Sequence, residues 1–240
     1  MAIVQDLISE LESAGNQADA LFLQGFFKTD PGEYGEGDRF LGVRVPQTRK
    51  IACRYAKDLK VEDLDVLLQS KWHEVRFAAL VVMRSNFKKS DAEGQKAIFD
   101  LYLKHIGKGI NNWDLVDVSC PNIVGTYLYK KGRRPLYDLA KGSLWQKRVS
   151  IISTFYFLRE GDPSDTYKLA EILVNENHDL LQKAVGWSLR EMGKLDDSLL
   201  YSFLDKYAAT MPRTALRYSL EKVPTHKKNK YMQAKLKGGK

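Results

Sequence analysis

The chain has 240 residues, of which 44% are hydrophobic and 28% are charged, and its formal net charge at pH 7 is +8. This length suits one large globular domain or one continuous superhelix with ample material for a core. No apolar run approaches the roughly 18 residues of a membrane span, and two cysteines, Cys53 and Cys120, are too few for a disulfide framework or a zinc site.

The positive charge favours association with polyanions, and nucleic acid is the first candidate. A basic surface that is merely solvated is the alternative. The N-terminal residues lack the basic segment of a secretion signal. Together with the sparse cysteines, this predicts a reducing intracellular compartment, and we expect a cytoplasmic location, of the bacterial type if the family resemblance described below holds.

The N-terminal third of the chain combines helices with one long loop. Amphipathic periodicity predicts helices over 2–14 and from about 17 to 28. The next segment, 29–39, is rich in Gly and acidic residues and is predicted to lack regular structure. Pro46 then begins a helix to about Lys57, because proline is well tolerated in the first helical turn.

From there the pattern predicts helix after helix, with almost no strand-type alternation. Residues such as Gly132, Pro163 and Gly193 separate the helices. The predicted fold class is therefore all-α. The expected helices are 61–69, 72–86, 91–106, 112–131, 135–140, 144–159, 163–175, 178–193, 196–208 and 211–222.

The expected domain organisation is one helical domain over 1–223 followed by a basic tail, 224–240. The tail carries a cluster of lysines and little apolar content, which predicts disorder. Its expected contribution is nonspecific attraction to phosphates.

Basic residues recur near the starts of predicted helices, followed each time by small residues. They are separated by 72, 35 and 30 residues. A period of about 30–40 residues with two helices per unit is typical of an α-solenoid of HEAT-like repeats. Such a superhelix exposes equivalent positions along one concave surface, so we expect a basic groove that neutralises phosphates. The basic residues are Arg76, Arg148, Lys183 and Arg213.

One repeat carries a carboxylate at the basic position. Trp72 precedes Arg76 by four residues, and Trp113 precedes Asp117 by the same spacing. On a helix, Trp113 and Asp117 therefore share one face. An acidic side chain in an apolar helical segment is costly unless it is paired or has a task, so Asp117 is a candidate functional residue.

Structural roles are the alternatives for these residues. Asp117 could pair with a neighbouring cation, and Trp113 could serve core packing alone. Trp187 lies one turn after Lys183 and could face the groove, where aromatic rings stack on bases or contact deoxyribose. The histidines show no metal-ligand spacing and no phosphate-binding glycine loop is present, so we expect neither a metal nor another cofactor.

Four segments together resemble the AlkD-type DNA glycosylases, a family of HEAT-like repeats. The resemblance extends from about residue 20 to 220, and the segments occur in order at family-like spacing. Each segment alone would be a weak signal, but the combination is specific. The segments are 41–49, 113–117, 144–148 and 182–191.

The resemblance implies excision of positively charged N3- and N7-alkylated purines, such as 3-methyladenine and 7-methylguanine, from duplex DNA in base excision repair. It also implies that the damaged base stays in the stack, unlike the flipped base of other glycosylases. By motif match, Asp117 is the expected catalytic carboxylate, Trp113 and Trp187 are its paired aromatics, and Arg148 contacts phosphate. The expected DNA contacts are Arg76, Arg148, Lys183, Arg190, Arg213 and Phe26.

The chain departs from the family pattern near the N-terminus. Asn112 stands where some members carry a further Trp, and Phe26 stands where a relative has Tyr. The loop 30–39 is also longer than the corresponding loop of that relative. These departures affect how the N-terminal helices hold DNA and which bulky adducts the site accommodates. They affect the chemistry of base excision less.

The expected mechanism assigns Asp117 to stabilise positive charge on the deoxyribose and to position water. We expect a monomer that acts on duplex DNA, associated with the nucleoid when bound. The rival interpretation is a noncatalytic HEAT-repeat scaffold that binds DNA or an acidic protein. A third is an RNA-binding solenoid, which would prefer single strands. The joint occurrence of Trp113, Asp117, Arg148 and Trp187 favours the enzyme.

Overall fold

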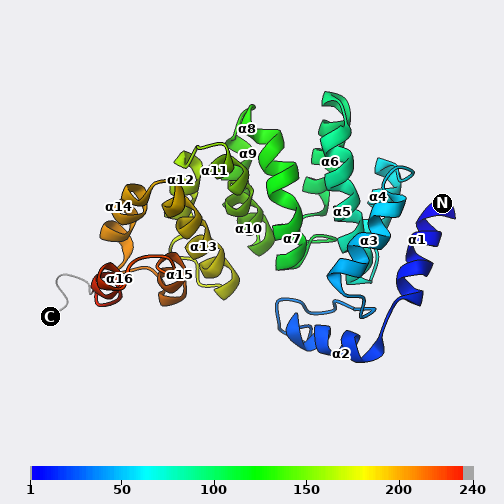
Figure 1. Ribbon diagram of the computed structural model, residues 1–240, viewed down its shortest axis with the longest axis horizontal. Coiled ribbons are helices and arrows are strands. Elements are labelled where there is room, and N and C mark those ends of the chain that lie inside the picture. Colours follow the sequence, from blue (N-terminus) through cyan, green and yellow to red (C-terminus); the bar gives the residue numbers. More distant parts are fainter. Residues whose placement is uncertain (1, 235–240) are drawn as a thin grey trace. The chain divides into compact units, whose positions relative to one another are not determined.

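The computed structural model describes residues 2–234, and the chain folds into helices joined by loops, of which the one between α2 and α3 is long (Figure 1). Within these residues, β-type pairing is limited to two isolated bridges, so the all-α prediction is confirmed. None of the helices in this described part is both long and apolar enough to cross a membrane. The contacts divide the chain into two compact units, Met1–Tyr127 and Leu128–Lys240. The single domain over 1–223 stays a prediction.

The first unit begins with two helices and a long loop, as the sequence predicts. Asn16 caps the second helix by accepting a hydrogen bond from the Asp19 backbone N–H. Pro46 lies in the first turn of the third helix. The helices are α1 (Ala2–Ser13), α2 (Gln17–Phe26), α3 (Val45–Tyr55), α4 (Val61–Leu68), α5 (His73–Lys89), α6 (Ala92–His105) and α7 (Trp113–Cys120).

The helix predicted over 112–131 is interrupted. After α7, the segment Pro121–Gly125 forms a π-helical turn, η1, and α8 (Thr126–Tyr129) continues across the boundary between the units. Pro121 has no backbone N–H and its ring crowds the preceding turn, so the regular hydrogen-bond ladder cannot continue through it.

Helix α5 is the centre of the first unit. It packs against α3, α4, α6 and α7. Its residues from His73 to Met83 are all buried, which explains why this helix shows no simple apolar stripe in the sequence. Ala78 and Ala79 lie in this stretch, and their small side chains allow neighbouring helices to approach closely.

The long loop is attached to α5 by one buried carboxylate. Glu74 accepts hydrogen bonds from the backbone N–H groups of Leu41, Gly42 and Val43 at 2.9, 2.8 and 3.2 Å. Gly42 has a φ of 82°, and a Cβ there would lie 2.0 Å from the Asn16 carbonyl oxygen. Glycine is therefore required at this position.

The second unit contains shorter helices arranged around α13. Ser143 and Gln146 form a capping box at the start of α10, and Asp196 caps α14. The helices are α9 (Arg134–Leu139), α10 (Leu144–Ser153), α11 (Phe155–Arg159), α12 (Ser164–Leu173), α13 (Asp179–Leu195), α14 (Asp197–Tyr207), α15 (Arg213–Ser219) and α16 (Thr225–Met232).

Three helices of the second unit, α10, α13 and α15, pack in succession. Helices α12 and α14 also pack against α13. Gly186 permits the close approach of α13 and α15, because a Cβ at this position would lie 2.4 Å from the Ala215 carbonyl oxygen. A continuous superhelix with a concave groove stays a prediction.

The prediction of a disordered tail is wrong for residues 225–232, which form α16. Tyr231 is buried, stacks on Tyr201 and donates a hydrogen bond to Asp205 at 3.0 Å. Lys227 Nζ lies 3.9 Å from the centroid of the Tyr201 ring. One aromatic anchor and a cation–π contact thus hold a helix whose composition is mainly polar. Residues 235–240 lie outside the described residues.

Replacing Glu74 by Gln should destabilise the first unit by about 3 kcal/mol. The amide has the same size as the carboxylate, but its NH₂ group would face backbone N–H donors. It also lacks the negative charge to which the three backbone N–H groups donate. Urea unfolding measures this loss. Glu93→Gln, in the exposed first turn of α6, is the matched control and should change stability by less than about 0.5 kcal/mol. Equal stability of the two variants would contradict the assigned role.

Candidate functional site

The pair Trp113 and Asp117 lies at the start of α7. Asn112, which is buried, caps this helix by accepting a hydrogen bond from the Trp113 backbone N–H at 2.9 Å. Trp113 is the first helical residue and Asp117 the fifth, so the two side chains emerge from one face, as the sequence predicts. Both are partly exposed.

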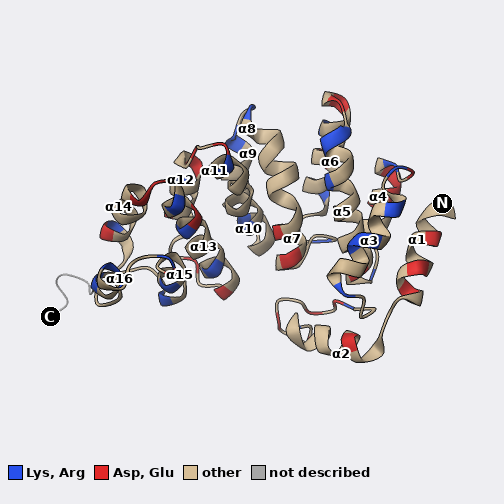
Figure 2. Ribbon diagram, in the orientation of Figure 1, with Lys and Arg blue, Asp and Glu red and all other residues tan. Residues whose placement is uncertain are grey.

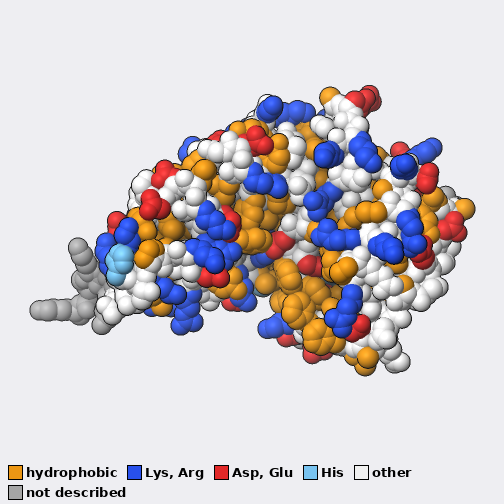
Figure 3. Space-filling view, in the orientation of Figure 1, with side chains coloured by type: hydrophobic (Ala, Val, Ile, Leu, Met, Phe, Trp, Pro, Cys, Tyr) orange, Lys and Arg blue, Asp and Glu red, His pale blue; other side chains and the backbone are white. Residues whose placement is uncertain are grey.

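The indole of Trp113 belongs to an aromatic cluster with α2. Its ring stacks on buried Phe27, with centroids 5.4 Å apart, and meets Phe26 edge-on at 6.1 Å. Phe26 is 54% exposed and stacks on Phe22, which is 63% exposed. Figure 3 shows the resulting hydrophobic patch over α2. The structure therefore brings Phe26 beside Trp113.

A buried chain of ionised groups lies beneath these rings. His73 Nδ1 and Asp38 Oδ2 are 2.8 Å apart, and His73 Nε2 is 2.8 Å from Asp114 Oδ2. Arg76 Nη2 donates to the other oxygen of Asp38 at 2.5 Å. The His73 ring also packs against Phe40 and Phe27. We call Asp38, His73, Arg76 and Asp114 the ion chain.

Within the ion chain, the pKa values of His73 and Asp38 are shifted in opposite directions. Burial alone would lower the pKa of His73, but the carboxylates of Asp114 and Asp38 outweigh burial and raise it to about 9. Burial would raise the pKa of Asp38, but hydrogen bonds and charges from His73 and Arg76 lower it to about 2. At neutral pH, His73 is therefore a cation and Asp38 an anion.

The position of Arg76 corrects one prediction. The sequence predicts that the Arg76 side chain is exposed in a basic groove, but in the structure Arg76 is only 5% exposed. Its Nη2 contacts Asp38 and Asn111, and Nη1 donates to the Ser70 carbonyl oxygen at 3.0 Å. The reason is that the loop carrying Asp38 folds over the start of α5, which the sequence does not reveal.

The basic positions of the second unit lie on successive packed helices. Arg148 is the fifth residue of α10 and Lys183 the fifth of α13, matching Asp117 in α7, while Arg213 begins α15. Figure 2 marks Lys and Arg positions in blue along the ribbon of these helices. Their exposure differs. Arg148 is 5% exposed and donates to the Leu180 carbonyl oxygen at 2.6 Å, whereas Arg213 is exposed.

Lys183 and Trp187 share one face of α13, four residues apart. Lys183 Nζ lies 2.6 Å from Asp179 Oδ2. The Trp187 ring meets Phe155 edge-on at 4.6 Å, and its Nε1 donates to Glu191 at 3.2 Å. Trp187 is partly exposed, so part of its ring is available to a ligand.

Arg190 is less accessible than a surface DNA contact would be. Its side chain is 18% exposed and is paired with the carboxylates of Glu191 and Glu221. To reach a phosphate, it would have to exchange these partners.

Each unit offers a distinct chemistry. The first unit supplies a carboxylate beside an indole, and the second supplies an indole beside cations. A carboxylate can stabilise a developing positive charge or orient water, and cations can neutralise phosphates. Among residues 2–234, no three His, Cys, Asp or Glu side chains are grouped so that they could hold a metal ion.

The comparison with protein-family models identifies one family. A family model described as "DNA alkylation repair enzyme" matches residues 7–223. A solved structure, a predicted DNA alkylation repair enzyme from Enterococcus faecalis, is similar with a TM-score of 0.68. Its sequence is 16% identical, and the alignment covers 88% of this chain and 97% of that one, so it supports the fold alone. A search of curated proteins found no match.

Because the ion chain needs His73 as a cation, we expect the free energy of unfolding to fall at alkaline pH. Because the pKa of His73 rises from 6.5 to about 9 on folding, its stabilisation is complete below about 6.5 and is lost as the pH rises through about 9. The loss should be about 3 kcal/mol. Urea unfolding of the wild type and of His73→Gln, at a series of pH values, measures it.

The two proteins should differ in the slope of stability against pH across this interval. Exposed His226 provides the control, because His226→Gln should keep the wild-type slope. Parallel pH dependences for the wild type and His73→Gln would show that His73 is not held as a cation.

Proposed function

Because the chain belongs to the family of DNA alkylation repair enzymes, we propose that it is a DNA glycosylase that excises cationic N3- and N7-alkylated purines from duplex DNA. The observation that carries the proposal is the Trp113–Asp117 pair at the start of α7. A scaffold that only bound DNA would need neither a carboxylate at a position that is basic in other repeats nor an indole on the same face.

Alkylation at N3 or N7 gives the purine a positive charge, which makes the base a good leaving group. As the N-glycosidic bond breaks, its electron pair goes to the base, which departs as a neutral purine. Positive charge builds on the deoxyribose, where Asp117 stabilises it. Water then attacks C1′ and releases a proton to the solvent, which leaves an abasic site. Asp117 orients that water as it approaches.

We assign the aromatic side chains to the sugar and phosphate of the lesion. The electron-rich faces of the Trp113 and Trp187 rings would favour the positive charge that develops on the deoxyribose. The contact between Phe26 and Trp113 supports this assignment, because it adds an exposed ring beside the indole. The base need not leave the stack, since the contacts are made to the backbone.

We assign the phosphate contacts chiefly to Lys183 and Arg213, which are more exposed than Arg148 and Arg190. Arg148 fits a positioning role, because its buried guanidinium already holds the backbone at the start of α13. Cationic alkylated bases lower the local anionic character of DNA only slightly, so phosphate neutralisation still supplies most of the affinity.

Asp117→Asn should retain DNA binding but lose about 10²–10³-fold in excision rate, because the amide lacks the charge that stabilises the developing cation. The measurement is the release of 7-methylguanine from methylated duplex DNA under single-turnover conditions, with binding measured in parallel.

Asp100→Asn makes the same chemical change at an exposed position of α6 and is the matched control. It should leave the excision rate unchanged. Unchanged release of 7-methylguanine by Asp117→Asn would remove the catalytic assignment, and binding without release by the wild type would favour the scaffold.

Lys183→Ala should weaken binding to duplex DNA and reduce the slope of log affinity against log salt by about 0.9, the share of one phosphate contact. Lys168→Ala removes an exposed lysine from the outer helix α12 of the same unit and provides the control. Fluorescence anisotropy at several salt concentrations measures both slopes. Identical slopes for the two variants would contradict a phosphate contact by Lys183.

A further inference from the structure

The second unit contains a cavity of about 380 Å³. It lies where the end of α13 and the start of α14 meet the end of α15 and the start of α16, four helices of that unit (Figure 1). Because α16 supplies one side of it, this cavity depends on a helix that the sequence did not predict. Its lining combines apolar and cationic side chains.

Apolar side chains form one part of the lining, and we call Leu200, Tyr201 and Val223 the apolar wall. Leu200 is 4% exposed, whereas Tyr201 and Val223 are half-buried. Gly193 also lines the cavity, and a Cβ at this position would lie 2.5 Å from Leu200 Cδ2. The glycine therefore leaves Leu200 in place. An apolar group that enters the cavity is removed from water, which favours its binding.

Cationic side chains form another part of the lining, and we call Lys194, Lys222 and Lys227 the cationic rim. Lys194 and Lys222 are exposed, so their ammonium groups are open to a ligand. Lys222 forms no ion pair with another residue of the described part of the chain. Lys227 Nζ lies 3.9 Å from the centroid of the Tyr201 ring, a contact that leaves its charge unneutralised.

The surroundings of the cavity are positive as well. Among residues 212–234, six are Lys or Arg and Glu221 is the only acidic residue. Carboxylates near the cavity offset part of this charge, because Glu221 and Glu191 pair with Arg190, and Asp197 lines the cavity. These three carboxylates stand against Arg190 and the three lysines of the cationic rim. Positive charge is therefore in excess and favours an acidic ligand.

Contacts at its C-terminal end hold α16 in place. Tyr231 stacks on Tyr201, and Arg213 Nη2 donates to the Met232 carbonyl oxygen at 2.6 Å. The start of α16 therefore has a defined position beside α14 and α15. A ligand that enters a preformed cavity does not lose affinity to the cost of ordering its walls.

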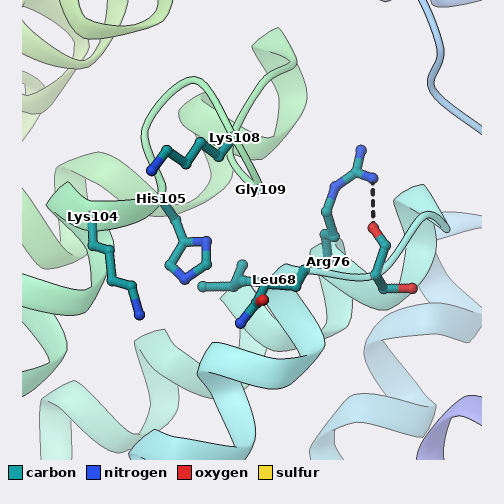
Figure 4. Close-up of a pocket in the computed structure, with 8 residues that line it drawn as sticks. Leu68, Arg76, Lys104, His105, Lys108 and Gly109 are labelled. Atoms are coloured by element: carbon teal, nitrogen blue, oxygen red, sulfur yellow. Dashed lines mark hydrogen bonds between the residues drawn. The ribbon is translucent and has the colours of Figure 1, made fainter.

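The first unit also has a cavity, of about 360 Å³, but most of its polar groups are engaged with the protein (Figure 4). Lys104 and His105 both contact the Asp65 carboxylate. Arg76 donates to the Ser70 carbonyl oxygen at 3.0 Å, as Figure 4 shows. The chemistry of that cavity therefore selects no ligand, in contrast to the cavity of the second unit.

We propose that the cavity of the second unit binds an acidic peptide segment of a partner protein, anchored by one large apolar side chain. The apolar side chain packs against the apolar wall, and neighbouring carboxylates pair with the cationic rim. The volume lies in the range of small ligand sites. A phosphate backbone would pair with the rim but has no group to cover the apolar wall. The proposal goes beyond the proposed glycosylase activity and does not depend on it.

The test uses the full chain and a fluorescently labelled synthetic peptide of Asp residues that ends in Phe. Fluorescence anisotropy should show saturable binding that weakens as salt is added. Replacing the Phe of the peptide by Ser should weaken binding by about tenfold, because the apolar wall is left without its partner. Replacing the Asp residues of the peptide by Asn should abolish the salt dependence.

Lys194→Gln combined with Lys222→Gln should weaken peptide binding by about fivefold, because each exposed ion pair contributes little. Lys141→Gln combined with Lys168→Gln removes the same charge from exposed lysines elsewhere in the second unit and should leave binding unchanged. Urea unfolding checks that both double variants are folded.

The absence of saturable peptide binding would overturn the proposal. Equal binding of the Phe and Ser peptides, or equal binding of the Phe peptide by the two double variants, would overturn it as well. Unmodified duplex DNA is the remaining probe. If the first double variant loses affinity for DNA while the wild type binds no peptide, the cationic rim contacts phosphate and the peptide proposal is wrong. Excision of 7-methylguanine is measured separately, so either proposal can fail alone.

Discussion

The buried carboxylate of Asp38 is the point on which the first unit depends. It comes from a loop without regular structure, yet it bonds both His73 and Arg76 near the start of α5, and His73 reaches on to Asp114 in α7. Burying one such charge is expensive, and only the complete set of partners offsets the cost. The ion chain therefore connects the loop, α5 and α7, and sets where Phe27 and Trp113 meet.

This arrangement explains how a carboxylate and an indole can be held at the start of a helix in a defined orientation. Asn112 caps the backbone of α7, Asp114 is held by His73, and Phe27 supports the ring of Trp113. Sites that act on a transition state need such support, because small displacements reduce electrostatic stabilisation. A passive scaffold would gain nothing from it. In the second unit, taken by itself, α13 carries Trp187 together with cations such as Lys183.

Local patterns in the sequence predicted the helices well, with most boundaries within three residues, because amphipathic periodicity and breakers act over a few residues. The shared face of Trp113 and Asp117 follows from helical geometry alone. The ion chain was not predictable, since Asp38 and His73 are 35 positions apart and Asp38 lies in an irregular loop. The burial of Arg76 follows from the same long-range contact. The helical tail depends on Tyr231 packing against distant Tyr201, a contact that composition does not show.

The ion chain beneath Trp113 requires His73 to be a cation at neutral pH. Direct NMR titration of the two His73 ring nitrogens tests it in the folded protein. Both nitrogens should carry protons at neutral pH, and the ring should lose one with a pKa of about 9. A His73 ring that titrates near its ordinary pKa of about 6.5 and is neutral at pH 7 would contradict the account.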